Sequence, residues 1–258
     1  MNWTILSKDN HFDLALSRQP NYLFAKKEII VPICSFELQT AVGIFPLIFV
    51  RREGQLEFCA LLGLERENNL FVDNRGAWAV KLRPALLEAF PFRIGKLKDG
   101  KNAVLFSKGS DLFVERNHGI PLFSEDRNES ETLKKYIHLL GQIEASNALL
   151  QKACGLIEEF GLLETFAIKF DKKHHQPSVL EGLLKINNTA FEELEEQKFR
   201  ELRASRALEL IYAHFYSLPN VEKILRLASL RDNSQNQLKN LGEKIFDDGQ
   251  KDLEINFD

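Results

Sequence analysis

The spacing of apolar residues changes once along the chain, close to residue 123. Between residues 25 and 123 the apolar residues form short β-branched or aromatic runs separated by Gly, Asn and Asp, a pattern typical of strands joined by turns. The runs are EIIVPI, FPLIFVRR, LEFCALLGL, NLFV, PFRIGKL, AVLFS and DLFVE. We therefore expect a β-rich N-terminal half with an antiparallel sheet.

Two short helices are expected to interrupt these strands. In the segment RPALLEAF, Pro84 suits the first position of a helix, where a backbone N–H has no partner to lose. Leu86, Leu87 and Phe90 then share one face of that helix. The segment SFELQTAV predicts the second helix, over residues 35–42.

The C-terminal half follows a helical period instead. From Glu129 to about Gly161, apolar residues recur every three or four positions, which fits either one long amphipathic helix or a helix pair. LLETFAIKF and SVLEGLLKIN then predict two strands, and residues 187–230 are helical in pattern. A break is expected at Leu218-Pro219-Asn220, because proline disfavours helical geometry in the residue before it.

The predicted fold class is therefore α+β, with a β-rich N-terminal half and a helical C-terminal half. We expect one domain over residues 1–231, β-rich over 25–123 and built of helices and one hairpin over 124–231. The remaining residues 232–258 hold seven acidic side chains against three lysines, so a solvated, mobile acidic tail is predicted there.

Composition narrows the range of partners and compartments. The net charge of −3 gives no positive field for nucleic acid, so a nucleic-acid partner is not expected. The N-terminus lacks a basic segment followed by an apolar core, and no run is long enough for a membrane span. We expect a cytoplasmic protein whose three isolated cysteines, Cys34, Cys59 and Cys154, are buried reduced thiols.

Three motifs resemble cofactor sites but fail in context. Residues 95–101 match the spacing of a phosphate-binding loop, yet Asn102 replaces the Ser or Thr that ligates magnesium, and a hairpin turn over residues 98–101 explains the glycine better. His11-Phe12-Asp13 has the spacing of a non-haem iron site, but no strands precede it to build one. His174 and His175 are expected at an exposed hairpin tip. We expect neither a metal nor another cofactor.

Two patches remain as candidate ligand sites. A turn is predicted at Asp73-Asn74-Arg75-Gly76, where the glycine tolerates positive φ. Trp78 is then expected to pack over Leu70 or Phe71, either as a packing anchor or as a pocket wall. In YAHFY, His214 lies between Tyr212 and Tyr216 on a predicted buried helix, where a core histidine bonded to a backbone carbonyl is favoured over a functional one. The candidate ligand-binding residues are Trp78, Asp73, Arg75, Tyr212 and His214.

Several segments together resemble the SapC family of bacterial proteins. They are VPICSFE, FPLIFVRR, ALLGLERENNLFVDNRGAW, RPALLEAFPFRI, HGIPLF and the stretch from EGLLKINN to LRLA, collinear over roughly residues 25 to 230. The resemblance implies envelope or nutrient-uptake biology, because the family is named for a gene associated with surface-layer proteins, and relatives are often encoded beside outer-membrane receptors. The family supplies no agreed catalytic residues. The chain departs from the family pattern at residues 79–80 and at residues 88–92, where EAFPF replaces a run that begins with two arginines.

The leading hypothesis is a non-enzymatic accessory or binding protein of a bacterial surface-layer or outer-membrane uptake system. The first alternative is an enzyme or enzyme partner that acts on a small molecule or peptide in a pocket near Trp78 and His214. The second is a structural assembly subunit. The partner is then an unidentified protein or small molecule, and neither a homo-oligomer nor envelope association conflicts with the sequence.

Overall fold

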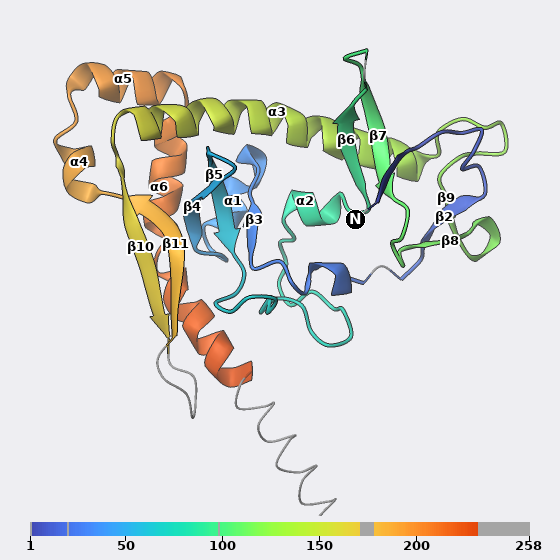
Figure 1. The fold of residues 1–258 in the computed structure, drawn as a ribbon, viewed down its shortest axis with the longest axis horizontal. Helices are drawn as coiled ribbons and strands as arrows, with labels where there is room; N and C mark the ends of the chain where they lie inside the picture. Colours follow the sequence, from blue (N-terminus) through green and yellow to red (C-terminus); the bar gives the residue numbers. More distant parts are fainter. Residues whose placement is uncertain (1, 20, 98, 171–177, 232–258) are drawn as a thin grey trace, which may run out of the picture.

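A computed structural model describes residues 2–19, 21–97, 99–170 and 178–231 (Figure 1). The predicted mixture of helices and antiparallel strands is confirmed. The largest sheet has the strand order β10-β11-β4-β5-β3. Its strands are β3 (Ile30–Pro32), β4 (Leu47–Arg52), β5 (Gln55–Leu61), β10 (Leu163–Phe170) and β11 (Ser178–Ile186). The hairpin that follows the long helix therefore completes a sheet begun in the N-terminal half.

Two three-stranded sheets hold the other strands. One has the order β1-β7-β6 and the other β8-β2-β9. Their strands are β1 (Trp3–Ile5), β2 (Leu14–Ser17), β6 (Phe92–Lys96), β7 (Asn102–Ser107), β8 (Phe113–Glu115) and β9 (Gly119–Pro121). The single sheet expected for this half is thus divided among three. NLFV was predicted as a strand, but its only ladder contact among the described residues is one isolated bridge from Val72 to Trp78.

The helices agree with the predicted segments. They are α1 (Leu38–Ala41), α2 (Ala85–Glu88), α3 (Glu131–Glu159), α4 (Asn188–Glu192), α5 (Glu196–Ala204) and α6 (Ala207–Ser217), with 3-10 turns η1 (Leu23–Ala25), η2 (Ser35–Glu37) and η3 (Arg116–His118). Pro84 immediately precedes α2 rather than opening it. A further helix begins at residue 220, so the break predicted at residues 218–220 is confirmed.

The segment from residue 129 to 161 forms one long helix, α3, and not a pair. At its start the Leu133 N–H donates to the Ser130 hydroxyl (3.2 Å), which satisfies one of the donors that a helix N-terminus leaves free. At its end Gly161 has a φ of +68°, and the Leu162 N–H donates to the Ile157 carbonyl (3.1 Å). This arrangement closes the last turn and needs a residue that tolerates the left-handed region.

Two hydrophobic cores lie under this helix, one beneath each of its halves. The first half carries Leu133, Leu140 and Ile143 into a smaller core with α2 and the small sheets. The second half carries Leu150 and Ile157 into the larger core. In Figure 1, α3 accordingly runs above α6 and the β4–β5 hairpin at one end and beside β6 at the other.

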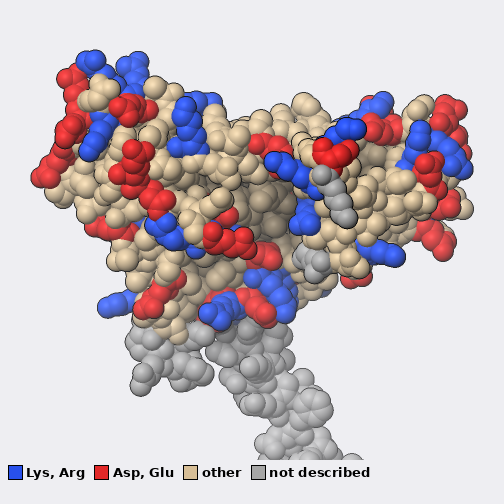
Figure 2. All heavy atoms as spheres, turned by 45° about the horizontal axis from the view of Figure 1, so that its top comes forward, with Lys and Arg blue, Asp and Glu red and all other residues tan. Residues whose placement is uncertain are grey.

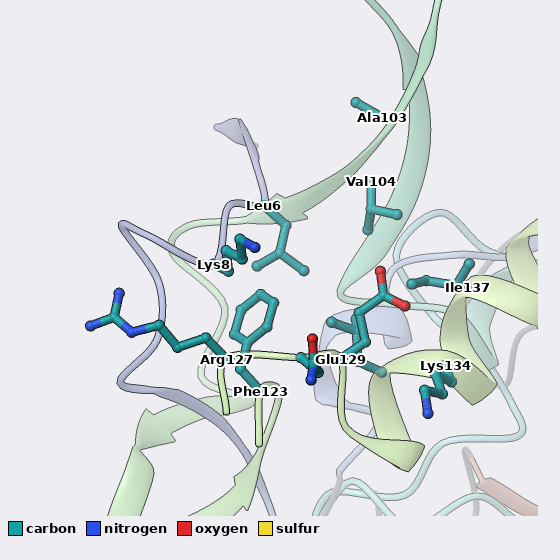
Figure 3. Close-up of a pocket in the computed structure, with 11 residues that line it drawn as sticks. Leu6, Lys8, Ala103, Val104, Phe123, Arg127, Glu129, Lys134 and Ile137 are labelled. Carbon is teal, nitrogen blue, oxygen red and sulfur yellow. The ribbon is translucent and has the colours of Figure 1, made fainter. Parts of the chain in front are cut away.

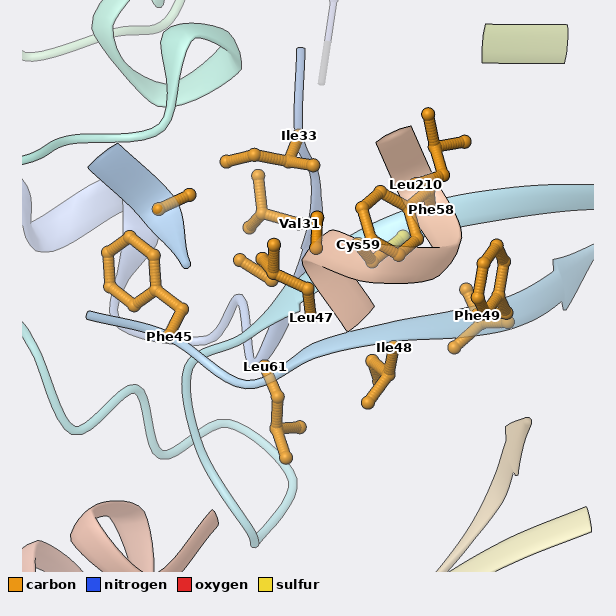
Figure 4. Close-up of a cluster of buried hydrophobic side chains, with 14 of the residues drawn as sticks. Val31, Ile33, Phe45, Leu47, Ile48, Phe49, Phe58, Cys59, Leu61 and Leu210 are labelled. Atoms are coloured by element: carbon orange, nitrogen blue, oxygen red, sulfur yellow. The ribbon is translucent and has the colours of Figure 1, made fainter. Parts of the chain in front are cut away.

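The larger core is rich in aromatic rings, in keeping with the 20 phenylalanines of the chain. Figure 4 shows Phe45, Phe49 and Phe58 among the aliphatic side chains of β4 and β5. Phe49 and Phe58 lie directly opposite each other on these strands, with ring centroids 4.7 Å apart. Such cross-strand aromatic pairs stabilise a sheet beyond the apolar area that they bury.

Several of the expected chemical features can now be located. Cys34, Cys59 and Cys154 are buried and unpaired, as predicted. The Leu97 N–H donates to the Lys101 carbonyl (2.8 Å) and Gly100 has a φ of +82°, so Leu97 and Lys101 close the connection between β6 and β7. His174, His175 and the acidic segment 232–258 lie outside the described residues.

In the described part of the chain, no three His, Cys, Asp or Glu side chains gather in a way that could hold a metal ion. None of the helices in that part has the length and apolar character needed to cross a bilayer. On the face shown in Figure 2, charges of both signs are interspersed.

Candidate functional site

The turn singled out in the sequence forms as predicted. The Asp73 carboxylate accepts hydrogen bonds from the backbone N–H groups of Arg75 and Ala77, each 2.8 Å long. These bonds, the one from Ala77 first, lower the pKa of Asp73. Gly76 has a φ of +81°, and its carbonyl accepts the Tyr22 N–H (2.8 Å). The turn therefore supports the segment that carries Tyr22.

Trp78 packs beside this turn. Its ring is stacked on that of Phe71, with centroids 6.0 Å apart, and is tilted against Tyr22 at 5.7 Å. Its Nε1–H donates to the Leu82 carbonyl (2.8 Å). The predicted contact with Phe71 is thus confirmed, and Trp78 is half-buried between the larger core and Tyr22.

His214 lies in the core, whereas its neighbour Tyr212 lies at the surface. The imidazole is fully buried, its Nδ1–H donates to the Leu47 carbonyl (2.7 Å), and its Nε2 accepts the Ile186 N–H (3.3 Å). Burial lowers the pKa of His214 to about 4, so the ring is neutral near pH 7. Tyr212 is 40% exposed on the other side of α6. The five candidate residues thus divide between one turn and two faces of one helix.

The structure brings together a different set of residues in a cleft where the N-terminal segment, α2 and α3 meet. We call it the Tyr22 cleft. It has a volume of about 290 Å³ and is lined by Leu16, Ser17, Arg18, Asn21, Tyr22, Phe24, Leu87, Glu88, Phe90, Leu112, Ile120, Thr132 and Tyr136. This volume is at the lower end of the range of small-molecule sites.

A hydrogen-bonded cluster borders the cleft, and its members Tyr22 and Glu88 belong to the lining. The Tyr22 hydroxyl donates to the Glu88 carboxylate (3.2 Å), and the Arg83 Nε–H donates to the same oxygen (2.5 Å). The Arg83 guanidinium also lies 5.6 Å from the centre of the Tyr22 ring. Burial, together with the charge of Glu88, raises the pKa of Tyr22 to about 12 and also raises that of Tyr136. Both phenols are therefore protonated donors near pH 7.

The lining also contains stacked aromatic rings and several polar side chains without a hydrogen-bond partner among the described residues. Phe24 and Phe90 are stacked with centroids 4.1 Å apart, and Tyr22 lies 5.8 Å from Phe24. The side chains of Arg18, Thr132 and Tyr136 make no hydrogen bond to another described residue. The cleft thus offers an apolar surface bordered by unused donors, the combination that orients small ligands.

A second, larger cleft lies on another side of α3 (Figure 3). It has a volume of about 660 Å³ and is lined by Leu6, Lys8, Ala103, Val104, Phe123, Arg127, Asn128, Glu129, Leu133, Lys134 and Ile137. Its cations do not converge, because Lys134 pairs with Glu131 (2.8 Å) and Arg127 extends away from Glu129 toward the Phe12 ring (5.0 Å). We therefore place the candidate site in the Tyr22 cleft.

The three cysteines and the buried Glu37 lie outside the lining of the Tyr22 cleft. Burial raises the pKa of Cys34 and of Cys154 to about 12 and raises that of Cys59 further. The buried Glu37 carboxylate accepts the N–H groups of Cys34 (2.8 Å) and Ala85 (2.7 Å), and so joins η2 to the start of α2. The three thiols and the Glu37 carboxylate are therefore parts of the packed interior and not of the candidate site.

Tyr22 and Tyr136 were not among the site residues predicted from the sequence. They belong to segments more than a hundred positions apart, and no motif connects them with Glu88. The available signal was the rarity of tyrosine, since two of the four tyrosines in the chain line this one cleft.

Comparison with known proteins identifies the family but no individual relative. No curated protein and no solved structure matches the chain. A family model described as SapC matches residues 6–224, which include every element from β2 to α6 and all the residues that line the Tyr22 cleft. The chain therefore belongs to the SapC family.

Proposed function

We propose that the protein is a non-enzymatic binding protein of a bacterial surface-layer or outer-membrane uptake system, and that it takes a small ligand in the Tyr22 cleft. The cellular setting is the one that the family resemblance implies. The observation that carries the binding role is that three side chains with unused donors, Arg18, Thr132 and Tyr136, line the same cleft as the stacked rings of Phe24 and Phe90.

The lining indicates the chemistry of the ligand. Guanidinium and hydroxyl groups donate hydrogen bonds, so they favour a ligand with acceptor oxygens, and the charge of Arg18 favours a carboxylate. The stacked rings of Phe24 and Phe90 favour a flat apolar body. We therefore propose a small aromatic or cyclic acid as the ligand class.

Two features support binding over catalysis. The three thiols are buried and held in their protonated form, so none is a ready nucleophile. Both ring nitrogens of His214 are engaged by backbone groups inside the core, which leaves the alternative of a catalytic pocket around Trp78 and His214 without an available base.

Binding is measured by ligand-observed NMR titration. The probe is benzoate, and benzyl alcohol is its uncharged counterpart. The parent protein is expected to bind benzoate more tightly than benzyl alcohol. Arg18→Ala is expected to remove this preference, since one charge-assisted hydrogen bond contributes about 1.5 to 3 kcal/mol. The matched control is Arg66→Ala, which removes an exposed arginine outside the cleft lining.

The Tyr136→Phe variant separates the cleft from general charge effects, because it deletes one donor and keeps the ring. It is expected to weaken benzoate binding several-fold while leaving the thermal unfolding midpoint within about 2 °C of the parent. Equal binding of benzoate by the parent, Arg18→Ala and Tyr136→Phe would show that the cleft is not the site.

A further inference from the structure

The outer side of the C-terminal helices carries exposed aromatic rings that the proposed function does not use. On α6, Tyr212 is 40% and Tyr216 70% exposed, and their rings are stacked with centroids 6.3 Å apart. Phe191 lies behind them, with its ring 6.1 Å from Tyr212, 5.9 Å from Phe215 and 6.2 Å from Phe199. We call these five residues the aromatic face.

Phe191 and Phe215 pack against the larger core, but Tyr212 and Tyr216 are not part of it. The inner side of α6 is already buried through Leu210, Ile211 and His214, so its outer side could be polar without cost to packing. Instead it presents two tyrosines one helical turn apart, and Phe191 connects Tyr212 to Phe199, which is 37% exposed. Contiguous exposed aromatic side chains are typical of protein interaction surfaces.

Acidic residues follow Phe191 of the aromatic face in the chain. Glu192, Glu193 and Glu195 follow Phe191 directly and are exposed. None of the three forms an ion pair with another described residue. By contrast, the neighbouring Glu196 pairs with Arg200 (2.5 Å) and Glu209 pairs with Arg206 (2.7 Å). Three carboxylates without cationic partners among the described residues therefore lie in the segment that carries Phe191 into the aromatic face.

We propose that the aromatic face docks an arginine-containing segment of a partner protein. Arginine is the side chain that satisfies both features at once, because its planar guanidinium stacks on tyrosine rings and also pairs with carboxylates. Tyr212 and Tyr216 would supply the stacking surface, and Glu192, Glu193 and Glu195 the charge. This surface is separate from the Tyr22 cleft, so the proposal does not depend on that site.

The probe is a labelled twelve-residue peptide that alternates arginine with serine, and binding to the full chain is followed by fluorescence anisotropy at low and high salt. The parent is expected to bind it in a salt-dependent manner. Tyr216→Ala is expected to weaken binding about two- to fivefold, the range for one exposed cation–π contact, whereas Tyr216→Phe keeps the ring and should bind like the parent.

A pair of charge-matched variants tests these three glutamates. Glu192→Gln, Glu193→Gln and Glu195→Gln combined should abolish most of the salt-dependent binding. The control combines Asp9→Asn, Asp13→Asn and Asp111→Asn, which removes three exposed carboxylates elsewhere in the chain and should leave binding unchanged. All these positions are exposed, so the variants are expected to keep the thermal unfolding midpoint of the parent, which is measured alongside.

Two results would overturn the proposal. One is an equal loss of binding in both triple variants, which would mean that only the net charge of the protein matters. The other is a concentration-dependent dimer, seen by analytical ultracentrifugation, that Tyr216→Ala dissociates, because the aromatic face would then be covered by a second copy of the chain.

Discussion

At the scale of single residues, buried polar side chains join segments that are distant in sequence. His214 connects α6 to β4 and β11 through its two ring nitrogens, and the Ser217 hydroxyl accepts the Leu47 N–H (2.8 Å) beside it. The Asn220 side chain donates to the Val42 and Phe45 carbonyls. Each of these bonds satisfies backbone groups at the ends of a strand or turn, where no ladder partner is available.

The burial of His214 predicts a specific dependence of stability on pH. The pKa of this imidazole is lowered to about 4 in the folded protein, whereas the unfolded chain has a value near 6.5. As the pH falls below 6.5 the unfolded chain therefore binds a proton that the folded protein does not, and stability decreases until about pH 4. Between pH 7 and pH 4.5 this one group should cost about 2 to 3 kcal/mol.

Urea unfolding of the parent and of His214→Gln at both pH values measures this contribution. Between pH 7 and pH 4.5 the free energy of unfolding should fall by about 2 kcal/mol more in the parent than in the variant. The carboxylates also titrate in this range, but they do so in both proteins. His138→Gln, which removes an exposed histidine of α3, is the control and should follow the parent. Parallel losses in the parent and in His214→Gln would contradict the assignment.

At the scale of elements, α3 contains glycines that its helical conformation does not require. An added Cβ at Gly141 meets no other described atom within 4 Å beyond its own helix backbone, and the same holds for Gly155. Gly76 is the opposite case, because its φ is +81° and an added Cβ would lie 2.8 Å from the Cβ of Asn21.

Alanine substitutions should therefore act in opposite directions at these positions. Gly141→Ala is expected to stabilise the protein by about 0.5 to 1 kcal/mol, since glycine in a helix interior costs conformational entropy. Gly76→Ala should destabilise it by more than about 1 kcal/mol through backbone strain and the clash with the Tyr22 segment. Denaturant midpoints at constant m-value measure both, and a stabilising Gly76→Ala would refute the turn geometry.

The elements that the sequence predicted well are those whose signal is local. The three- and four-residue spacing and Gly161 located α3, and alternation located the β10–β11 hairpin. β1, β2 and β9 have three or four residues each, too few for a period to appear, and they were missed. β3 and β8 are equally short but lie in the predicted runs EIIVPI and DLFVE. Alternation also says nothing about which strand is the partner, which is why the division into three sheets could not be predicted.

The same distinction applies to the candidate site. The Asp73 turn and the contact of Trp78 with Phe71 were predictable, because both depend on residues close in sequence. The bond from Tyr22 to Glu88 joins positions 66 residues apart, and its formation depends on how η1 and α2 pack. A single sequence without a motif gives no indication of such a pairing.

At the scale of the whole molecule, the two cores share one covering helix. Ser146 marks the junction: it is buried, and its hydroxyl accepts the Ser35 N–H (2.7 Å), with the smaller core on one side along α3 and the larger core on the other. At 29 residues, α3 is about 43 Å long and reaches both. Loss of order in α3 would therefore uncover both cores together.

This sharing predicts a single unfolding transition, and the two tryptophans report on it separately. Trp3 belongs to the β1-β7-β6 sheet beside the smaller core, whereas Trp78 packs against the larger core. The variants Trp3→Phe and Trp78→Phe each leave one fluorescent reporter. Within each variant, the fluorescence midpoint in urea should coincide with the midpoint from far-UV circular dichroism, which monitors the whole chain. A clear difference between the two midpoints would mean that the cores unfold independently.

The shared helix also limits how such a protein can change over evolutionary time. Domains with separate covers can be duplicated, fused or lost one at a time, but here the larger sheet takes strands from both sides of α3, and that helix closes both cores. A gene fission within α3 would leave two fragments that each expose apolar surface and aggregate. The two halves must therefore be inherited as a single unit, although each has its own core.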